Sequence, residues 1–198
     1  MTKIAYSTMI GLFIGFSLFW RPAVAQEIDT VNNFILKKGE KEVALADFRD
    51  QKVVVVVFTS SHCSWATQYV DRLHDMHKAF KDSSVAFIAI NSNDPTLSQR
   101  DAEARMGKFA PFPFPYLKDK DQKVAKMFNI TKNPEVVVLT PRTKGFDVIY
   151  RGKIDDNPLD ASMVKQSFLN DAIHMGLKGE KPEESSTTPN GCSIKWMD

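Results

Sequence analysis

The feature that most constrains the fold is an unbroken apolar run, Val53 to Phe58, made of five valines and a phenylalanine. β-Branched residues favour extended structure, and a run without polar alternation is typical of a central strand buried on both faces. A second apolar run, Val85 to Ile90, predicts another such strand. Since both faces of these strands must be covered, the two runs predict an α/β architecture.

The remaining segments alternate between helical and extended patterns. Apolar spacing predicts an amphipathic helix from Ala66 to Lys81. Two neighbouring strands are expected late in the chain, and this order of elements is typical of an α/β sandwich with parallel and antiparallel strands. Further elements are expected as helices at 97–109, 122–128 and 161–177, as strands at 136–140 and 147–150, and as a hairpin from 34 to 45 that turns at Gly39.

The first 25 residues have the pattern of a secretory signal peptide. Lys3 provides the positive charge, the stretch from Met9 to Trp20 is apolar, and Ala23-Val24-Ala25 is a small-residue cleavage site. A membrane-spanning helix needs roughly 20 apolar residues, more than this stretch contains. We therefore expect residues 1–25 to be removed and the protein to be periplasmic or secreted, meeting the membrane only through the cleaved leader.

Removal of this leader would leave 198 − 25 = 173 residues, enough for one domain with a substantial core. The leader holds Lys3, Arg21 and no acid, so the remainder has 26 − 2 = 24 basic and 24 acidic residues. A net charge of zero argues against nucleic acid as a partner. We expect the domain at 26–180, followed at 181–198 by a polar, flexible linker and an apolar tail that docks.

The chain has two cysteines, Cys63 and Cys192. Cys63 follows a buried strand and precedes a helix, where the helix dipole favours a nucleophilic thiolate. Its neighbours are polar and turn-like, which favours a reactive thiol over a buried structural one. In an exported chain the two cysteines could pair, and such a disulfide could be structural or redox-active.

Several motifs together resemble the thioredoxin-fold redoxins of the alkyl hydroperoxide reductase/thiol-specific antioxidant group, in particular an exported subgroup that ends in GCSIKW. The resemblance covers essentially the whole chain after the leader, and it implies a thioredoxin-like α/β/α sandwich with a central mixed β-sheet. The motifs that carry it are FTSSHCSWATQYVDRL, VAFIAINSND, FPFPYLKDKDQKVAKMFNI, NPEVVVL, IYRGKIDDNP and GCSIKW.

The resemblance implies that Cys63 is the nucleophile. Ala66 occupies the position of the second cysteine of a thioredoxin C-x-x-C, and Ser60 occupies the position of an upstream cysteine found in the subgroup. Cys192 is then the only thiol of the chain that could resolve an oxidised Cys63; otherwise an external thiol must do so.

The resemblance also implies where a substrate binds. Pro134 would be a cis-proline that keeps a strand edge open, and the backbone beside it, at Asn133, would pair with an extended substrate. The alternative is an ordinary proline at the start of a strand. The other residues expected around the substrate are His62, Ser60 and Trp65.

The function that we expect is thiol-disulfide oxidoreductase, and a thiol peroxidase is the first alternative. Peroxiredoxins carry P-x-x-x-T-x-x-C, and here Ser60 matches the hydroxyl while Val56 replaces the proline. No arginine stands at Asn133-Pro134-Glu135, where that family has one, although Arg142 and Arg151 are close in sequence. The second alternative is a non-enzymatic domain in which a Cys63–Cys192 disulfide only holds the tail.

The substrates expected are protein thiols and disulfides or small peroxides, together with an external thiol reductant. No cofactor is expected. No metal is expected either, because His74 and His77 share a helix but have no matching cluster elsewhere in the sequence.

Overall fold

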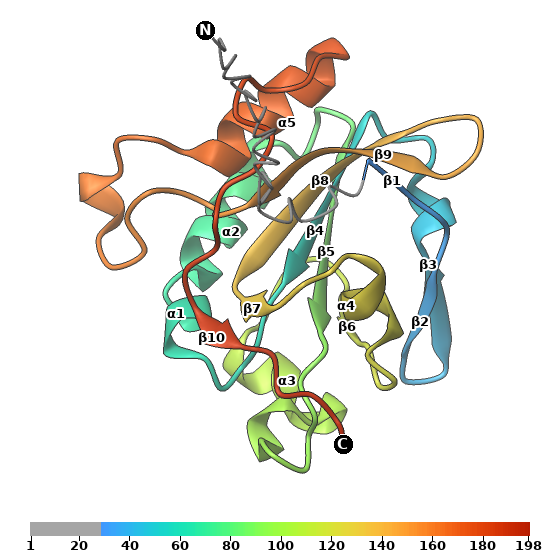
Figure 1. Cartoon of the computed structure of the whole chain (residues 1–198), viewed down its shortest axis with the longest axis vertical. Helices are drawn as coiled ribbons and strands as arrows, with labels where there is room; N and C mark the ends of the chain where they lie inside the picture. The colour runs from blue at the N-terminus through green and yellow to red at the C-terminus, as the bar shows by residue number, and fades with distance from the viewer. Residues whose placement is uncertain (1–28) are drawn as a thin grey trace, which may run out of the picture.

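The computed structural model describes residues 29–198 and shows an α/β sandwich around a mixed sheet (Figure 1). The predicted leader, residues 1–25, lies outside the described residues. Within residues 29–198 the main sheet has eight strands in the order β1-β9-β8-β4-β5-β6-β2-β3. These strands are β1 (Thr30–Val31), β2 (Ile35–Lys38), β3 (Lys41–Ala44), β4 (Val53–Phe58), β5 (Val85–Asn91), β6 (Tyr116–Lys118), β8 (Glu135–Pro141) and β9 (Phe146–Gly152).

Strand β4 lies in the middle of the sheet because its side chains are apolar on both faces. All six of its residues are fully buried. Val53, Val55 and Val57 pack into one core with helices on that face, whereas Val54, Val56 and Phe58 pack into a second core on the other face. The prediction of a strand buried on both faces is confirmed.

The sheet is mixed, as predicted. Strand β4 runs parallel to β5 and antiparallel to β8, while β5 runs parallel to β6. Since the carboxyl ends of parallel β4 and β5 lie at the same edge, the loops that follow them are neighbours. The expected hairpin also forms, with β2 paired antiparallel to β3.

Five α-helices occur in the described part of the chain: α1 (Ser64–Thr67), α2 (Val70–Ala79), α3 (Glu103–Phe109), α4 (Lys123–Met127) and α5 (Phe168–Lys178). Short 3₁₀ turns lie at Leu45–Phe48, Gln99–Asp101 and Ala161–Met163. The helix predicted at 66–81 is divided, and the other three predicted helices are shorter than expected. Within residues 29–198 no helix is both long and apolar enough to cross a bilayer.

Long-range contacts lie at the places where the helices break. The helix predicted at 66–81 divides at Tyr69, whose hydroxyl donates to the Asp155 carboxylate at 2.7 Å. The helix predicted at 161–177 is interrupted because the Lys165 backbone N–H donates to the Asp156 carboxylate, so that α5 begins only at Phe168.

The C-terminal segment runs across the domain and contacts it at several places (Figure 1). Near its start, Ser186 forms a parallel bridge with Arg151 in β9, and Thr187 Oγ1 accepts from the Lys153 backbone N–H. A Cβ atom at Gly152, where φ is +134°, would overlap the Thr187 backbone. Farther on, β10 (Cys192–Ser193) pairs antiparallel with β7 (Lys132–Asn133).

Candidate functional site

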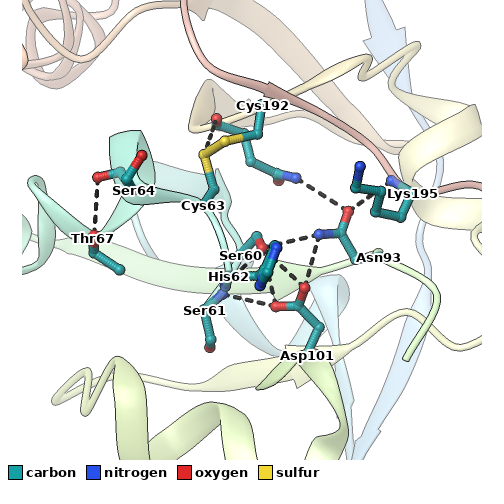
Figure 2. Close-up of a disulfide and its surroundings, with 11 residues drawn as sticks. Ser60, Ser61, His62, Cys63, Ser64, Thr67, Asn93, Asp101, Cys192 and Lys195 are labelled. Carbon is teal, nitrogen blue, oxygen red and sulfur yellow. Dashed lines mark hydrogen bonds between the residues drawn. A yellow bond between two sulfur atoms is a disulfide. The ribbon is translucent and has the colours of Figure 1, made fainter. Parts of the chain in front are cut away.

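A disulfide joins Cys63 to Cys192, 129 residues later in the sequence (Figure 2). Cys63 lies between β4 and α1 as predicted, at the N-cap of that helix. It is 2% exposed, whereas Cys192 is half-buried. The pairing that the sequence left open is therefore the one that the structure contains.

Cys63 lies at the start of a short helix and beside a backbone carbonyl. Helix α1 is a single turn, so its macrodipole is small compared with that of the long helix expected. The sulfur lies 3.3 Å from the backbone carbonyl oxygen of Asn133.

The tail pairs with the backbone beside Pro134. The Asn133–Pro134 peptide bond is cis, as the resemblance implies. In the β10–β7 ladder Cys192 lies opposite Asn133. A Cβ atom at Gly191 would overlap the carbonyl oxygen of Asn133, so only glycine allows the tail this approach. The tail thus occupies the place at which the resemblance implies an extended substrate.

The residues after Cys192 hold the tail through one apolar side chain and several backbone hydrogen bonds. Ile194 is 4% exposed and belongs to the core on the α4 face of the sheet, and its N–H donates to the Thr131 carbonyl at 2.9 Å. The Lys195 N–H donates to Asn93 Oδ1 at 2.9 Å, and the Lys195 carbonyl accepts from Gln122 Nε2 at 2.7 Å. These contacts continue the register that β10 begins.

A buried polar network lies below the disulfide (Figure 2). Its centre is the Asp101 carboxylate, which is fully buried. This carboxylate accepts from the Ser60 hydroxyl at 3.0 Å, the Ser61 N–H at 2.8 Å, the Asn91 amide at 2.7 Å and the Asn93 amide at 2.9 Å.

Burial and hydrogen bonding oppose each other at Asp101. Desolvation acts to raise the pKa of its carboxyl, but hydrogen bonds from Asn93, Asn91 and Ser60 outweigh it and leave the pKa below the usual value. Asp101 is therefore an anion within the core.

Two further ionisable groups are buried beside this network. Desolvation lowers the pKa of the Lys118 ammonium to about 8, although Asp101 and Asp119 oppose the shift. Desolvation raises the pKa of Glu135, next to Pro134, and its ion pair with Arg151 at 2.8 Å offsets part of that rise. The bond from Lys118 Nζ to Asn91 Oδ1, 3.1 Å long, ties this cation to the same network.

The residues predicted around a substrate divide into two groups. Asn133 and Pro134 lie at the disulfide, and Trp65, 37% exposed, follows Cys63 on α1. His62 is exposed, and its backbone N–H donates to Ser60 Oγ at 3.1 Å. Ser60 itself is buried, because Asp101 draws its hydroxyl into the interior.

Sequence reasoning missed the polar residues that support the site. Asn91, Asn93 and Asp101 lie beneath the disulfide, and Gln122 holds the tail. A usable signal was present for the first two, since Asn91 ends β5 and Asn93 lies two residues beyond it. β5 is parallel to β4 and so ends beside Cys63. Asp101 gave no such signal, because it lies in a polar stretch that reads as a solvated helix.

No cluster of three or more His, Cys, Asp or Glu side chains that could hold a metal occurs within residues 29–198.

The solved structures that resemble this chain include two of uncharacterised proteins. A hypothetical protein from Sinorhizobium meliloti is 26% identical, with a TM-score of 0.76 over 89% of this chain and 97% of that one. A conserved protein from Geobacillus kaustophilus is also 26% identical, with a TM-score of 0.76 over 87% and 94%.

More distant similarity establishes the fold. A thiol-disulfide oxidoreductase from Bacteroides fragilis is 18% identical, with a TM-score of 0.51 over 66% of this chain and 93% of that one. It supports a thioredoxin-like fold and nothing finer. Among curated proteins, none matches the chain. The model of the AhpC/TSA family matches residues 28–154, which include Cys63 and Pro134, and the chain therefore belongs to the AhpC/TSA family.

Proposed function

We propose that this protein is an exported thiol-disulfide oxidoreductase in which Cys63 is the nucleophile and Cys192 the resolving thiol. The observation that carries the proposal is the disulfide between a cysteine at a strand–helix junction and a tail cysteine paired beside cis-Pro134. A purely structural disulfide requires only the bond between the two cysteines. An exchanging pair also requires its resolving thiol beside the β7 edge, where a substrate would bind.

The proposed reaction is an exchange of disulfides. In the reduced protein, Cys63 thiolate attacks a substrate disulfide, so that a mixed disulfide forms and one substrate thiolate leaves. Cys192 thiolate then attacks the Cys63 sulfur, releasing the second substrate thiol and forming Cys63–Cys192. An external thiol reductant returns the pair to two thiols. An attacking thiol is most effective when its pKa is near ambient pH.

The tail and a substrate strand would use the same backbone. Asn133 pairs with Cys192 in the oxidised protein. After reduction the tail is no longer held covalently, and the edge of β7 becomes available for an extended substrate by strand addition. The substrate and the tail would therefore occupy the edge of β7 one after the other.

Two observations favour exchange over peroxide reduction. The Ser60 hydroxyl, which would have to polarise a peroxide, is buried and donates to Asp101. Arg151, the arginine in the strand next to β8, donates to Glu135 at 2.8 Å. Both groups that could position a peroxide oxygen are thus already engaged within the protein.

Insulin reduction by dithiothreitol tests the proposal. We expect the wild-type protein to accelerate precipitation of the insulin B chain, Cys63→Ser to abolish the acceleration, and Cys192→Ser to accumulate mixed disulfide. Peroxide consumption measured in parallel should stay at the Cys63→Ser level. Turnover of peroxide but not insulin would replace the proposal by a thiol peroxidase. Neither activity, with a disulfide potential well below about −300 mV, would indicate a structural bond.

The proposed location rests on the leader pattern. We expect the N-terminus of the protein from a secreting host to begin at Gln26, which intact-mass measurement of the periplasmic and medium fractions would show. Full-length protein retained with membranes would contradict cleavage.

A further inference from the structure

Asn93 connects both cysteine-bearing segments through one side-chain amide (Figure 2). It is 3% exposed. Its Nδ2 donates to Ser60 Oγ at 2.9 Å, three residues before Cys63. Its Oδ1 accepts from the Lys195 backbone N–H at 2.9 Å, three residues after Cys192. The same Oδ1 accepts from Asn133 Nδ2 at 3.3 Å, and Asn133 supplies the carbonyl oxygen beside the Cys63 sulfur.

Asp101 fixes the direction of this amide. Its Oδ2 accepts from Asn93 Nδ2 at 2.9 Å, and an ionised carboxylate has only acceptors to offer. If the amide turned over, Asn93 Oδ1 would face the carboxylate and Nδ2 would face the N–H of Lys195, so an acceptor would meet an acceptor and a donor a donor. The buried anion therefore keeps Oδ1 directed at the tail.

We propose that Asn93, oriented by Asp101, is a positioning residue that sets the effective concentration of the Cys192 thiol at Cys63. The Asn93 amide holds the tail through the backbone N–H of residue 195, so this contact does not depend on the side chain at that position. This inference rests on the proposed use of Cys63 and Cys192 as an exchanging pair. It predicts that the contact favours the disulfide more than it favours the reduced fold.

Equilibration of the purified protein with mixtures of reduced and oxidised glutathione tests this inference. In the reaction, two glutathione thiols reduce Cys63–Cys192 to two thiols and become one glutathione disulfide. Lys195→Pro removes the N–H that donates to Asn93, and Lys195→Ala is the matched control that keeps it. Both substitutions are at a residue whose side chain is exposed.

We expect Lys195→Pro to lower the equilibrium constant for disulfide formation about two- to tenfold, the contribution of one intramolecular hydrogen bond. A tenfold fall corresponds to a reduction potential about 30 mV higher. Lys195→Ala should stay within about twofold of wild type. Guanidinium unfolding of the reduced protein should be the same for both variants, whereas a purely structural contact would destabilise the reduced form of Lys195→Pro as well.

A double-mutant cycle separates the hydrogen bond from steric effects of the proline. In an Asn93→Ala background the acceptor is gone, so adding Lys195→Pro should cost nothing further. Additive effects would overturn the inference. So would equal potentials for Lys195→Pro and Lys195→Ala, a result that stands even if Asn93→Ala does not fold.

The outcome is separable from that of the proposed function. A protein with no insulin turnover but a potential that responds to Lys195→Pro would lose the proposed function and keep the positioning role. Normal turnover with an unresponsive potential would remove only the positioning role.

Discussion

Reduction of Cys63–Cys192 should greatly destabilise the whole domain. The bond closes a loop of 129 residues, most of the described chain. In the chain-entropy description, a crosslink over a loop of this length removes about 5 kcal/mol of conformational freedom from the unfolded state. Because the tail also packs Ile194 into the core, the native geometry that the crosslink requires is already present in the fold.

The measurement is guanidinium unfolding followed by far-ultraviolet circular dichroism, with and without dithiothreitol. With a denaturant slope of roughly 2–6 kcal/mol/M, a loss of about 5 kcal/mol lowers the midpoint by about 1–2.5 M. Mass spectrometry of alkylated protein must show that both thiols are free in the reduced sample. Cys192→Ala is the control, since dithiothreitol should leave its midpoint unchanged and equal to that of reduced wild type.

A midpoint shift below about 0.3 M with both thiols free would refute the reasoning, because it would mean that the crosslink hardly restricts the unfolded chain. A dithiothreitol effect of similar size on Cys192→Ala would show that the shift has another origin.

Three further substitutions test other parts of the structure. Gly191→Ala places a Cβ against the Asn133 carbonyl and should lower the equilibrium constant for disulfide formation roughly tenfold or more, given overpacking costs of about 1–3 kcal/mol. The control is Gly107→Ala, because a Cβ at Gly107 meets nothing within 4 Å. Equal equilibrium constants for the two variants would contradict the steric role of Gly191. Ile194→Ala should lower the unfolding free energy of the oxidised protein by about 2–4 kcal/mol. The side chain of Trp196 is 37% exposed and contacts the Lys126 ammonium through its ring, so Trp196→Ala should cost about 1 kcal/mol or less. The reverse order in thermal or guanidinium unfolding would be inconsistent with the docked tail. The pKa of Lys118 is about 8 in the fold and ordinarily 10.5, so between these pH values the unfolded chain binds more protons, and the stability of wild type should rise with pH relative to that of Lys118→Met. Lys120→Met, a substitution at an exposed lysine, should show the wild-type profile. Parallel stability profiles for wild type and Lys118→Met from about pH 7.5 to about pH 10 would disprove the shift.

The central strands of the sheet and the position of Cys63 were predictable because each depends on local pattern. The run Val53–Phe58 specifies a doubly buried strand whatever surrounds it, and Cys63 follows from the end of that strand. The break between α1 and α2 was not predictable, because the apolar spacing continues through Tyr69. At the break the Tyr69 hydroxyl donates to the carboxylate of Asp155, 86 residues away, and no periodicity can register such a contact.

The polar support of the site was harder to predict for a similar reason. Asp101 lies among charged and polar residues, and its sequence neighbours give no sign that it is fully buried. Its burial depends on donors from two separate segments, one with Ser60 and Ser61 and the other with Asn91 and Asn93. Sequence pattern reports the faces of helices and strands well, but it does not report which polar groups meet across them.

The tail can pack against the domain only because two positions are glycine and carry no side chain. Gly152 lies in the domain and leaves room for Thr187, and Gly191 lies in the tail and leaves room for Asn133. A chain that folds its C-terminus back in this way must therefore keep both positions bare, 39 residues apart. For anyone comparing related chains, a larger residue at the first position predicts that the tail runs elsewhere, even when the terminal cysteine is present. Two glycines thus provide a marker for the bound tail that does not depend on cysteine.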